Sequence, residues 1–405
     1  MGKIKKRQVI DFGLKLITYL ASLVSVVILG AILVYIFSYG TKLLSIDIIT
    51  SDYNPKSYQL NTTVDVYTND FSNPNIDDTY FSERFGFAVS NSETKEGKSA
   101  IRFVYIDDNS PLLSAVNAQG ETIEFKEGFI FNQTMRAVLE NGQTRTIFSR
   151  NGAEALVDNL DDAIRIEAAF VQQEGGGIRS SILTTLLLIV VTLTIGLPFG
   201  VLTALYLHEI APQNKITNLL RTFIDMLTGV PSIIFGLMGA AVFIPFTTKL
   251  FGDESMQRGS VIAGALTLVV IILPVVIKAT ESALDVVPKE YKEGSLALGA
   301  NKTQTTFRIM LPNALPGILS AALLSIGRII GESAALIFAM GTFISDNVSL
   351  TGRSTSLSVH VWAVMGGEIP NVDLASTIAI IILAVVLILN ILVKIITNKF
   401  MKRYN

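Results

Sequence analysis

Long apolar runs dominate the pattern of hydrophobic and polar positions along this chain. A hydrocarbon core about 30 Å thick is crossed by roughly 20 helical residues, and six runs reach about that length. Five of them contain no charged residue, whereas the fifth along the chain contains Arg328 and Glu332. The runs cover residues 16–37, 182–207, 226–248, 259–277, 314–344 and 374–393. The pattern predicts an all-α polytopic membrane protein with six membrane-spanning helices.

A long polar stretch separates the first two runs. Residues 41–174 are numerous enough for a small domain. The segments "SAIRFVYIDD" and "ETIEFKEGF" favour strands, because large apolar and β-branched residues alternate with polar ones. The segment "GAEALVDNLDDAIRIEAAFVQQ" favours a helix leading back to the membrane, with Leu156, Leu160 and Ile164 on one stripe. We therefore expect an α/β extracytoplasmic domain inserted between the first and second spans, followed by a five-helix core over 175–397.

Lysine and arginine gather at both ends of the chain. Region 1–40 consists of the basic segment "MGKIKKR" followed by the first span, which we interpret as a retained anchor. Basic residues are also frequent in and just before the C-terminal region 398–405. Because basic residues concentrate on the cytoplasmic side, we expect both termini in the cytoplasm, and an even number of spans agrees. The acidic stretch 41–174 then lies outside a multi-pass protein of the cell membrane.

Composition excludes several classes of site. The 405 residues are 50% hydrophobic and 16% charged, with a net charge of -2, two histidines and no cysteine. Disulfides and thiolate sites are therefore excluded, and a histidine-rich metal site is not expected. The chain also lacks a complete nucleotide-binding motif. We expect no catalytic residue, no metal, no cofactor and no nucleic-acid partner.

The connection between the fourth and fifth spans is larger than a simple link. Over 281–312, the segment "PKEYKEGSLALGANKTQTTFRIMLP" predicts a short helix after Pro288, a turn at Gly299 and a second, apolar helix. An amphipathic loop at the membrane surface and a docking surface for another protein explain this pattern equally well.

The spacing within this loop resembles that of permease subunits of ABC importers. Their cytoplasmic loop has the form E-A-A, three residues, G, nine residues, I-x-L-P. This chain has the same spacing, with small residues in place of the two alanines. The matching residues are Glu293, Gly294, Ser295, Gly299, Ile309, Leu311 and Pro312. The resemblance implies that this loop couples the spans to an ATPase.

Two further stretches, "TGVPSIIFGLMG" and "GRIIGESAALIFAMG", resemble the permeases of phosphate importers, most closely the PstA type. The resemblance extends over about 175–397 and, by position, to the first span. It implies the type I ABC permease fold and alternating-access import of inorganic phosphate, with ATP hydrolysis left to a partner. The implied partners are a homologous second permease, a cytoplasmic ATPase dimer, an extracellular phosphate-binding protein and membrane lipid. Residues 41–174 depart from the family, so no role follows for them.

Arg328 and Glu332 are the candidate substrate-pathway residues. A mid-membrane arginine costs at least about 2.5–3.5 kcal/mol, and Glu332 lies four residues further along the expected helix, where an ion pair can form. A guanidinium matches two oxyanion oxygens, and a carboxylate can accept a hydrogen bond from the protonated oxygen of hydrogen phosphate, whereas sulfate has no such proton to donate. The residues alone also allow simple mutual neutralisation, or a contact with a neighbouring helix.

Several other functions stay open at this point. The chain could be a permease for another oxyanion, such as sulfate or molybdate, or the sister phosphate permease subunit. A secondary transporter would need no docking loop, and we find no inverted repeat. A membrane-anchored sensor would not need five further spans.

Overall fold

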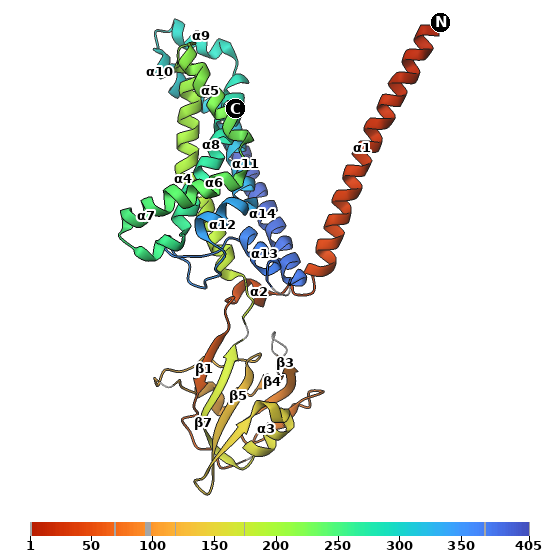
Figure 1. Ribbon diagram of the computed structural model, residues 1–405, viewed down its shortest axis with the longest axis vertical. Coiled ribbons are helices and arrows are strands. Elements are labelled where there is room, and N and C mark those ends of the chain that lie inside the picture. The colour runs from red at the N-terminus through yellow and green to blue at the C-terminus, as the bar shows by residue number, and fades with distance from the viewer. Residues whose placement is uncertain are drawn as a thin grey trace. The chain divides into compact units, whose positions relative to one another are not determined.

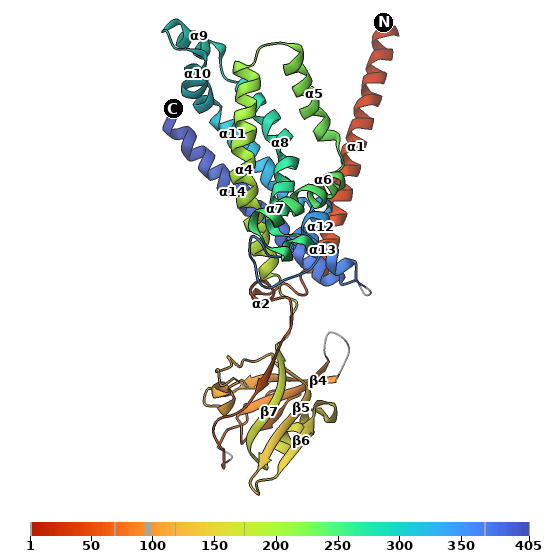
Figure 2. The same ribbon diagram turned by 60° about the vertical axis from the view of Figure 1, so that its left-hand side comes forward.

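The computed structural model contains two compact units, Met1–Ser51 with Ile178–Asn405 and, separately, Asp52–Gly177. It describes residues 2–68, 70–93, 99–117, 119–173, 175–367 and 370–404. Helices make up the first unit, whereas the second is built mainly of strands (Figures 1 and 2). We call these the membrane unit and the outer unit, and describe each by itself.

The outer unit is an antiparallel sheet with one main helix. Its strands run in the order β1-β7-β5-β4-β3-β2, and β6 pairs with β5; every pair is antiparallel. The strands are β1 (Lys56–Leu60), β2 (Tyr80–Ser82), β3 (Phe87–Glu93), β4 (Ser99–Ile106), β5 (Ile130–Leu139), β6 (Thr144–Phe148) and β7 (Ala163–Gln173), and the helix is α3 (Gly152–Leu160). Two short 3-10 turns, η1 (Pro111–Ser114) and η2 (Ser149–Asn151), complete the unit.

Apolar side chains of the sheet and of α3 form the core of the outer unit. Phe87, Phe103 and Phe131 are fully buried, as are Leu156 and Leu160 of α3. Aromatic rings contribute large buried areas and pack well when tilted against one another. The core explains why this stretch of the chain folds as a compact unit.

Two secondary-structure predictions for the outer unit were wrong. Residues 163–173 form the central strand β7, not the continuation of the helix, because α3 ends at Leu160 and β7 pairs with both β1 and β5. The stretch 121–129 forms no ladder strand. Its alternation still buries Ile123 and Phe125, but the Phe125 N–H bonds to the Ile123 carbonyl and bends the backbone. The predicted α/β domain is therefore mainly an antiparallel sheet.

In the described part of the membrane unit, six helices are long and apolar enough to cross a membrane. They cover Asp11–Gly40, Arg179–Ile210, Ser232–Phe251, Val261–Asp285, Lys302–Gly331 and Val372–Ile395. The α-helices are α1 (Gly2–Gly40), α2 (Ile46–Thr50), α4 (Arg179–Leu205), α5 (Lys215–Gly229), α6 (Ser232–Met238), α7 (Ile244–Phe251), α8 (Val261–Asp285), α9 (Lys289–Ala297), α10 (Lys302–Thr305), α11 (Leu311–Gly331), α12 (Ala334–Met340), α13 (Leu357–Met365) and α14 (Val372–Tyr404). Shorter turns are η3 (Tyr206–Ile210), η4 (Gly239–Phe243), η5 (Glu254–Arg258) and η6 (Thr306–Met310).

The third and fifth spans differ from their predicted ranges. Residues 226–229 belong to α5, which ends before Pro231; proline lacks an N–H and restricts the residue before it, so a new helix begins at Ser232. The fifth span begins at Lys302, within the predicted loop, and ends at Gly331. Residues 334–340 form the separate helix α12.

Glycines allow α4 and α8 to pack closely in the core of the membrane unit. A Cβ atom at Gly196 would lie 2.7 Å from Ile272, and one at Gly200 would lie 2.5 Å from Val276. Small residues permit such close approach between membrane helices. Ile272 and Val276 are fully buried within this cluster.

Candidate functional site

Arg328 lies on a face of α11 that the chain leaves uncovered. The exposed positions near the end of this helix are Ser320, Leu324, Gly327, Arg328 and Gly331, which follow the helical repeat. The Arg328 side chain is 49% exposed. A Cβ atom at Gly327 or Gly331 would meet nothing within 4 Å. The guanidinium therefore extends from a face lined partly by small residues.

The helix ends directly after Arg328. Glu332 has φ -79° and ψ 118° and is the C-terminal cap of α11. Arg328 thus lies in the last turn, where the partial negative charge of the helix end favours a cation. The prediction that Arg328 and Glu332 share one continuous helix was wrong, because the backbone leaves the helical conformation between them.

Glu332 is held mainly by backbone contacts. It is 7% exposed, and its Oε1 accepts a hydrogen bond of 3.2 Å from the Ala335 N–H at the start of α12. Its carbonyl oxygen accepts a bond of 2.7 Å from the Ser358 hydroxyl on α13. Its Oε2 lies 3.9 Å from Arg328 Nε, close to the longest separation of an ion pair. Glu332 thus joins the ends of three helices and directs one oxygen toward Arg328.

The loop that follows α8 contains the expected short helix, turn and second helix. Pro288 caps α9, which ends before Gly299, whose φ of 89° lies in the left-handed region that glycine adopts readily. The second helix begins after a capping box between Asn301 and Gln304. It continues through η6 into α11, so the motif residues Ile309, Leu311 and Pro312 lie in the fifth span.

The first half of the motif is exposed within this chain. Glu293, Gly294 and Gly299 are exposed, while Ser295 Oγ lies 2.9 Å from Thr305 Oγ1 on α10. A Cβ atom at Gly294 would meet nothing within 4 Å. Packing against the described residues of this chain therefore does not require a small residue at Gly294.

Apolar side chains around the loop also lack cover in this chain. Leu298 is 91% exposed, Val286 is 82% exposed and Tyr291 is 51% exposed. Exposed apolar groups beside a membrane span are typical of a surface that another protein covers.

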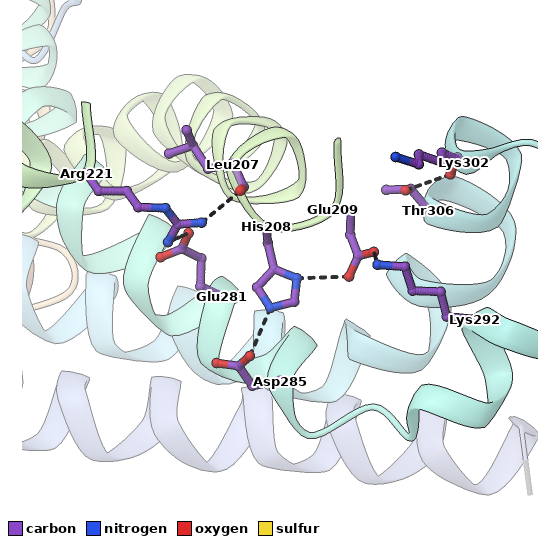
Figure 3. A network of polar contacts seen from close by, with 9 residues as sticks. All are labelled: Leu207, His208, Glu209, Arg221, Glu281, Asp285, Lys292, Lys302 and Thr306. Carbon is purple, nitrogen blue, oxygen red and sulfur yellow. Dashed lines mark hydrogen bonds and ion pairs between the residues drawn. The ribbon is translucent and has the colours of Figure 1, made fainter. Parts of the chain in front are cut away.

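A polar network beneath the loop escaped the sequence analysis (Figure 3). His208 Nδ1 lies 2.8 Å from Glu209 Oε1, and His208 Nε2 lies 2.9 Å from Asp285 Oδ1. Glu209 Oε2 lies 2.6 Å from Lys292 Nζ on α9. The only sequence signal was a histidine and a glutamate directly after an apolar run, and their partners are distant in sequence.

Ion pairs join α5 to α8 beside this network. Arg221 Nη1 lies 2.9 Å from Glu281 Oε1, and Lys278 Nζ lies 2.8 Å from Asp225 Oδ1. Arg221 also donates a hydrogen bond of 2.7 Å to the Leu207 carbonyl. The ends of α4, α5 and α8 are therefore connected by charged side chains.

Known proteins share this organisation in sequence. The family described as "Binding-protein-dependent transport system inner membrane component" matches residues 196–405, just over half of the chain. The chain is 35% identical over 213 residues to the probable ABC transporter permease protein YqgI of Bacillus subtilis, covering 49% of this chain and 70% of that protein.

Phosphate transport permeases are among the relatives. The chain is 31% identical over 223 residues to the phosphate transport system permease protein PstA of Pasteurella multocida, covering 55% of this chain and 76% of that protein. It is 35% identical over 192 residues to the phosphate transport system permease protein PstA 1 of Mycobacterium tuberculosis, covering 47% of this chain and 60% of that protein. The chain belongs to the binding-protein-dependent transport system inner membrane component family, as an ABC importer permease subunit of the PstA type.

Proposed function

We propose that this permease translocates inorganic phosphate by alternating access, with Arg328 as an anion-binding group in the pathway. A homologous second permease completes the pathway, a cytoplasmic ATPase dimer drives it, and an extracellular binding protein delivers the anion. The names of the PstA relatives support phosphate as the substrate. The chain itself performs no chemistry.

The uncovered position of Arg328 carries this proposal. A guanidinium that faces lipid costs up to about 2.5–3.5 kcal/mol, the value at a helix centre, and Arg328 lies in the last turn of its span. Arg328 is nevertheless half-exposed in the single chain. We infer that its face meets another subunit or a water-filled pathway. The neighbouring Gly327 and Gly331 leave room beside the guanidinium for an anion.

The chemistry of the pair suits hydrogen phosphate. The planar guanidinium can donate two parallel hydrogen bonds to a tetrahedral oxyanion and stays charged at physiological pH. Glu332 Oε1 is engaged by Ala335, whereas Oε2 faces Arg328. A carboxylate oxygen there can accept a hydrogen bond from the protonated oxygen of hydrogen phosphate, and would repel a sulfate, which has no proton to donate.

The exposed cytoplasmic loop supports coupling to an ATPase. Leu298, Tyr291 and the exposed motif residues of α9 form one uncovered region. We propose that the ATPase covers it, and that Glu293 and Gly299 orient and end the docking helix. In this orientation both termini lie in the cytoplasm. The structure does not describe the side chains of residues 1–10 and 400–405, which include most of the basic residues behind this prediction.

Phosphate uptake tests the proposal directly. The assembled transporter is placed in vesicles, and uptake of radiolabelled phosphate is competed with arsenate, sulfate and molybdate. We expect competition by arsenate alone. Because a charge-assisted hydrogen bond contributes about 1.5–3 kcal/mol, Arg328→Gln should slow uptake by about 10- to 100-fold.

Two controls sharpen this measurement. Arg328→Lys keeps the positive charge but removes the two parallel N–H donors of the guanidinium. The rate of uptake should therefore be intermediate between those of the wild type and Arg328→Gln. Arg258→Gln removes an exposed arginine of η5 and should leave uptake unchanged. Strong competition by sulfate, or normal uptake by an assembled Arg328→Gln complex, contradicts the proposal.

A further inference from the structure

Glu209 is an acidic side chain buried at the end of a membrane helix. Its side chain is 2% exposed, and it lies in η3, the wide helical turn that ends α4. Such π turns often occur at functional sites. A buried carboxylate is costly unless it is paired. Lys292 Nζ at 2.6 Å and His208 Nδ1 at 2.8 Å provide that pairing.

His208 extends the same network to α8. Its Nε2 lies 2.9 Å from Asp285 Oδ1, in the last residue of that helix. Both contacts of the ring are hydrogen bonds only when both nitrogens carry protons. The four side chains Lys292, Glu209, His208 and Asp285 then alternate in charge, and Figure 3 shows them in sequence between α9, the end of α4 and the end of α8. We call them the cytoplasmic node.

The docking helix α9 depends on polar contacts of this kind. None of its side chains is buried. Lys292 connects it to α4 through Glu209, and Ser295 contacts Thr305 of α10, which continues into α11. A displacement of α9 therefore reaches the ends of the spans through a few defined side chains.

We propose that Glu209 and His208 are positioning residues of the coupling step, which transmit movement of α9 to α4 and α8 together. Lys292 is the contact on the docking helix, and Asp285 is the contact on α8. This inference rests on the proposed function, because it assumes that a partner ATPase moves α9. A purely structural node would instead stabilise the fold without affecting coupling.

The decisive variant is the double substitution Glu209→Gln with Lys292→Met. It removes both charges and keeps similar volumes, so no unpaired charge stays buried. The complex is purified through its ATPase subunit and reconstituted in vesicles, where imported inorganic phosphate and hydrolysed ATP are both measured. We expect at least about a fivefold fall in phosphate imported per ATP, with ATP hydrolysis retained.

Lys278→Met is the matched control. Lys278 forms an ion pair of 2.8 Å with Asp225 at the same end of the unit, but it connects α5 to α8 and does not contact α9 through that pair. We expect this variant to import the wild-type amount of phosphate per ATP.

A second readout does not depend on the identity of the anion. The chain has no cysteine, so Leu324→Cys, on the same face of α11 as Arg328, introduces the single labelling site of this chain, and labelling is followed on this chain alone. Its rate of reaction with a water-soluble maleimide is measured with and without a non-hydrolysable ATP analogue. We expect the nucleotide to change this rate in the otherwise wild-type complex and in Lys278→Met, but not in the double variant.

The outcomes separate this inference from the proposed substrate. One outcome is that no phosphate is imported, while the nucleotide changes the labelling rate in the wild type and in Lys278→Met but not in the double variant. The substrate assignment then fails and the inference holds. Wild-type coupling in the double variant overturns the inference, as does an equal loss in Lys278→Met. A reporter that ignores the nucleotide, or a double variant that no longer binds the ATPase, also overturns it.

Discussion

Substitution of Glu332 separates its helix-capping contact from its charge. Glu332→Gln keeps an oxygen that can accept the Ala335 N–H bond, and the Ser358 bond goes to the backbone carbonyl, so both contacts survive. The variant loses only the ion pair with Arg328, whose closest atoms are 3.9 Å apart. Glu332→Ala loses the cap and the charge together.

The magnitudes of these losses differ. A half-exposed ion pair contributes about 0.2–1 kcal/mol, so Glu332→Gln should destabilise the chain by less than about 1 kcal/mol. A side-chain cap contributes about 0.5–2 kcal/mol, so Glu332→Ala should cost about 1–3 kcal/mol in total. Each kcal/mol lowers Tm by about 2–4 °C in a protein of about 150–250 residues, and by less in a longer chain such as this one.

Thermal unfolding of the purified chain in detergent measures this difference. Glu332→Gln should melt close to the wild type, whereas Glu332→Ala should melt several degrees lower. Phosphate uptake by the assembled complex should fall in both, because both lack the carboxylate. Equal losses of Tm in the two variants would refute the reasoning, since they would show that the charge, and not the cap, holds Glu332 in place.

Four further substitutions test predictions of stability. A Cβ atom at Gly236 would lie 2.7 Å from the backbone of Ala335, so Gly236→Ala should destabilise the chain by about 1–3 kcal/mol. Gly294→Ala should not lower the Tm of the isolated chain, because a Cβ atom at this position would meet no described atom within 4 Å. A similar fall in Tm for Gly236→Ala and Gly294→Ala would contradict this reasoning. Burial lowers the pKa of His360 from 6.5 to about 4, so stability present above pH 6.5 is lost as the pH falls toward 4, by about 3 kcal/mol. His360→Gln should flatten this dependence of Tm on pH, and an unchanged dependence would exclude the histidine as its cause. Burial, with nearby carboxylates, raises the pKa of Asp161 above its usual 3.8, so ionised Asp161 destabilises the outer unit. Asp161→Asn should raise the calorimetric Tm of that unit at pH 7 but not below pH 3.8, and an equal gain at both pH values would refute this.

The membrane spans were predictable because their signal is local. A run of about 20 apolar residues has few alternatives to a helix, since no water satisfies backbone groups within lipid. The motif that begins at Glu293 was recognisable for a similar reason, because its spacing is contained in one loop. The boundaries were less predictable: a new helix begins directly after Pro231, and a helix ends just before Glu332, each within a continuous apolar run.

The outer unit shows where local patterns fail. Residues 163–173 carry a helical stripe as readily as a strand pattern. Their partners decide the outcome, since β7 pairs with β1, more than a hundred residues earlier in the chain, and with β5. Long-range pairing of this kind overrides intrinsic preference.

The sequence by itself determined the class of protein and the presence of six spans, and it located the loop motif and the candidate arginine. These depend on composition, run length and spacing, which are properties of neighbouring residues. Only the tertiary structure decided that Arg328 lies on an uncovered face, that Glu332 accepts a hydrogen bond from the first turn of a second helix, and that His208 meets Asp285. The physical reason is that burial and pairing depend on which distant segments pack together, and His208 and Asp285 are 77 residues apart.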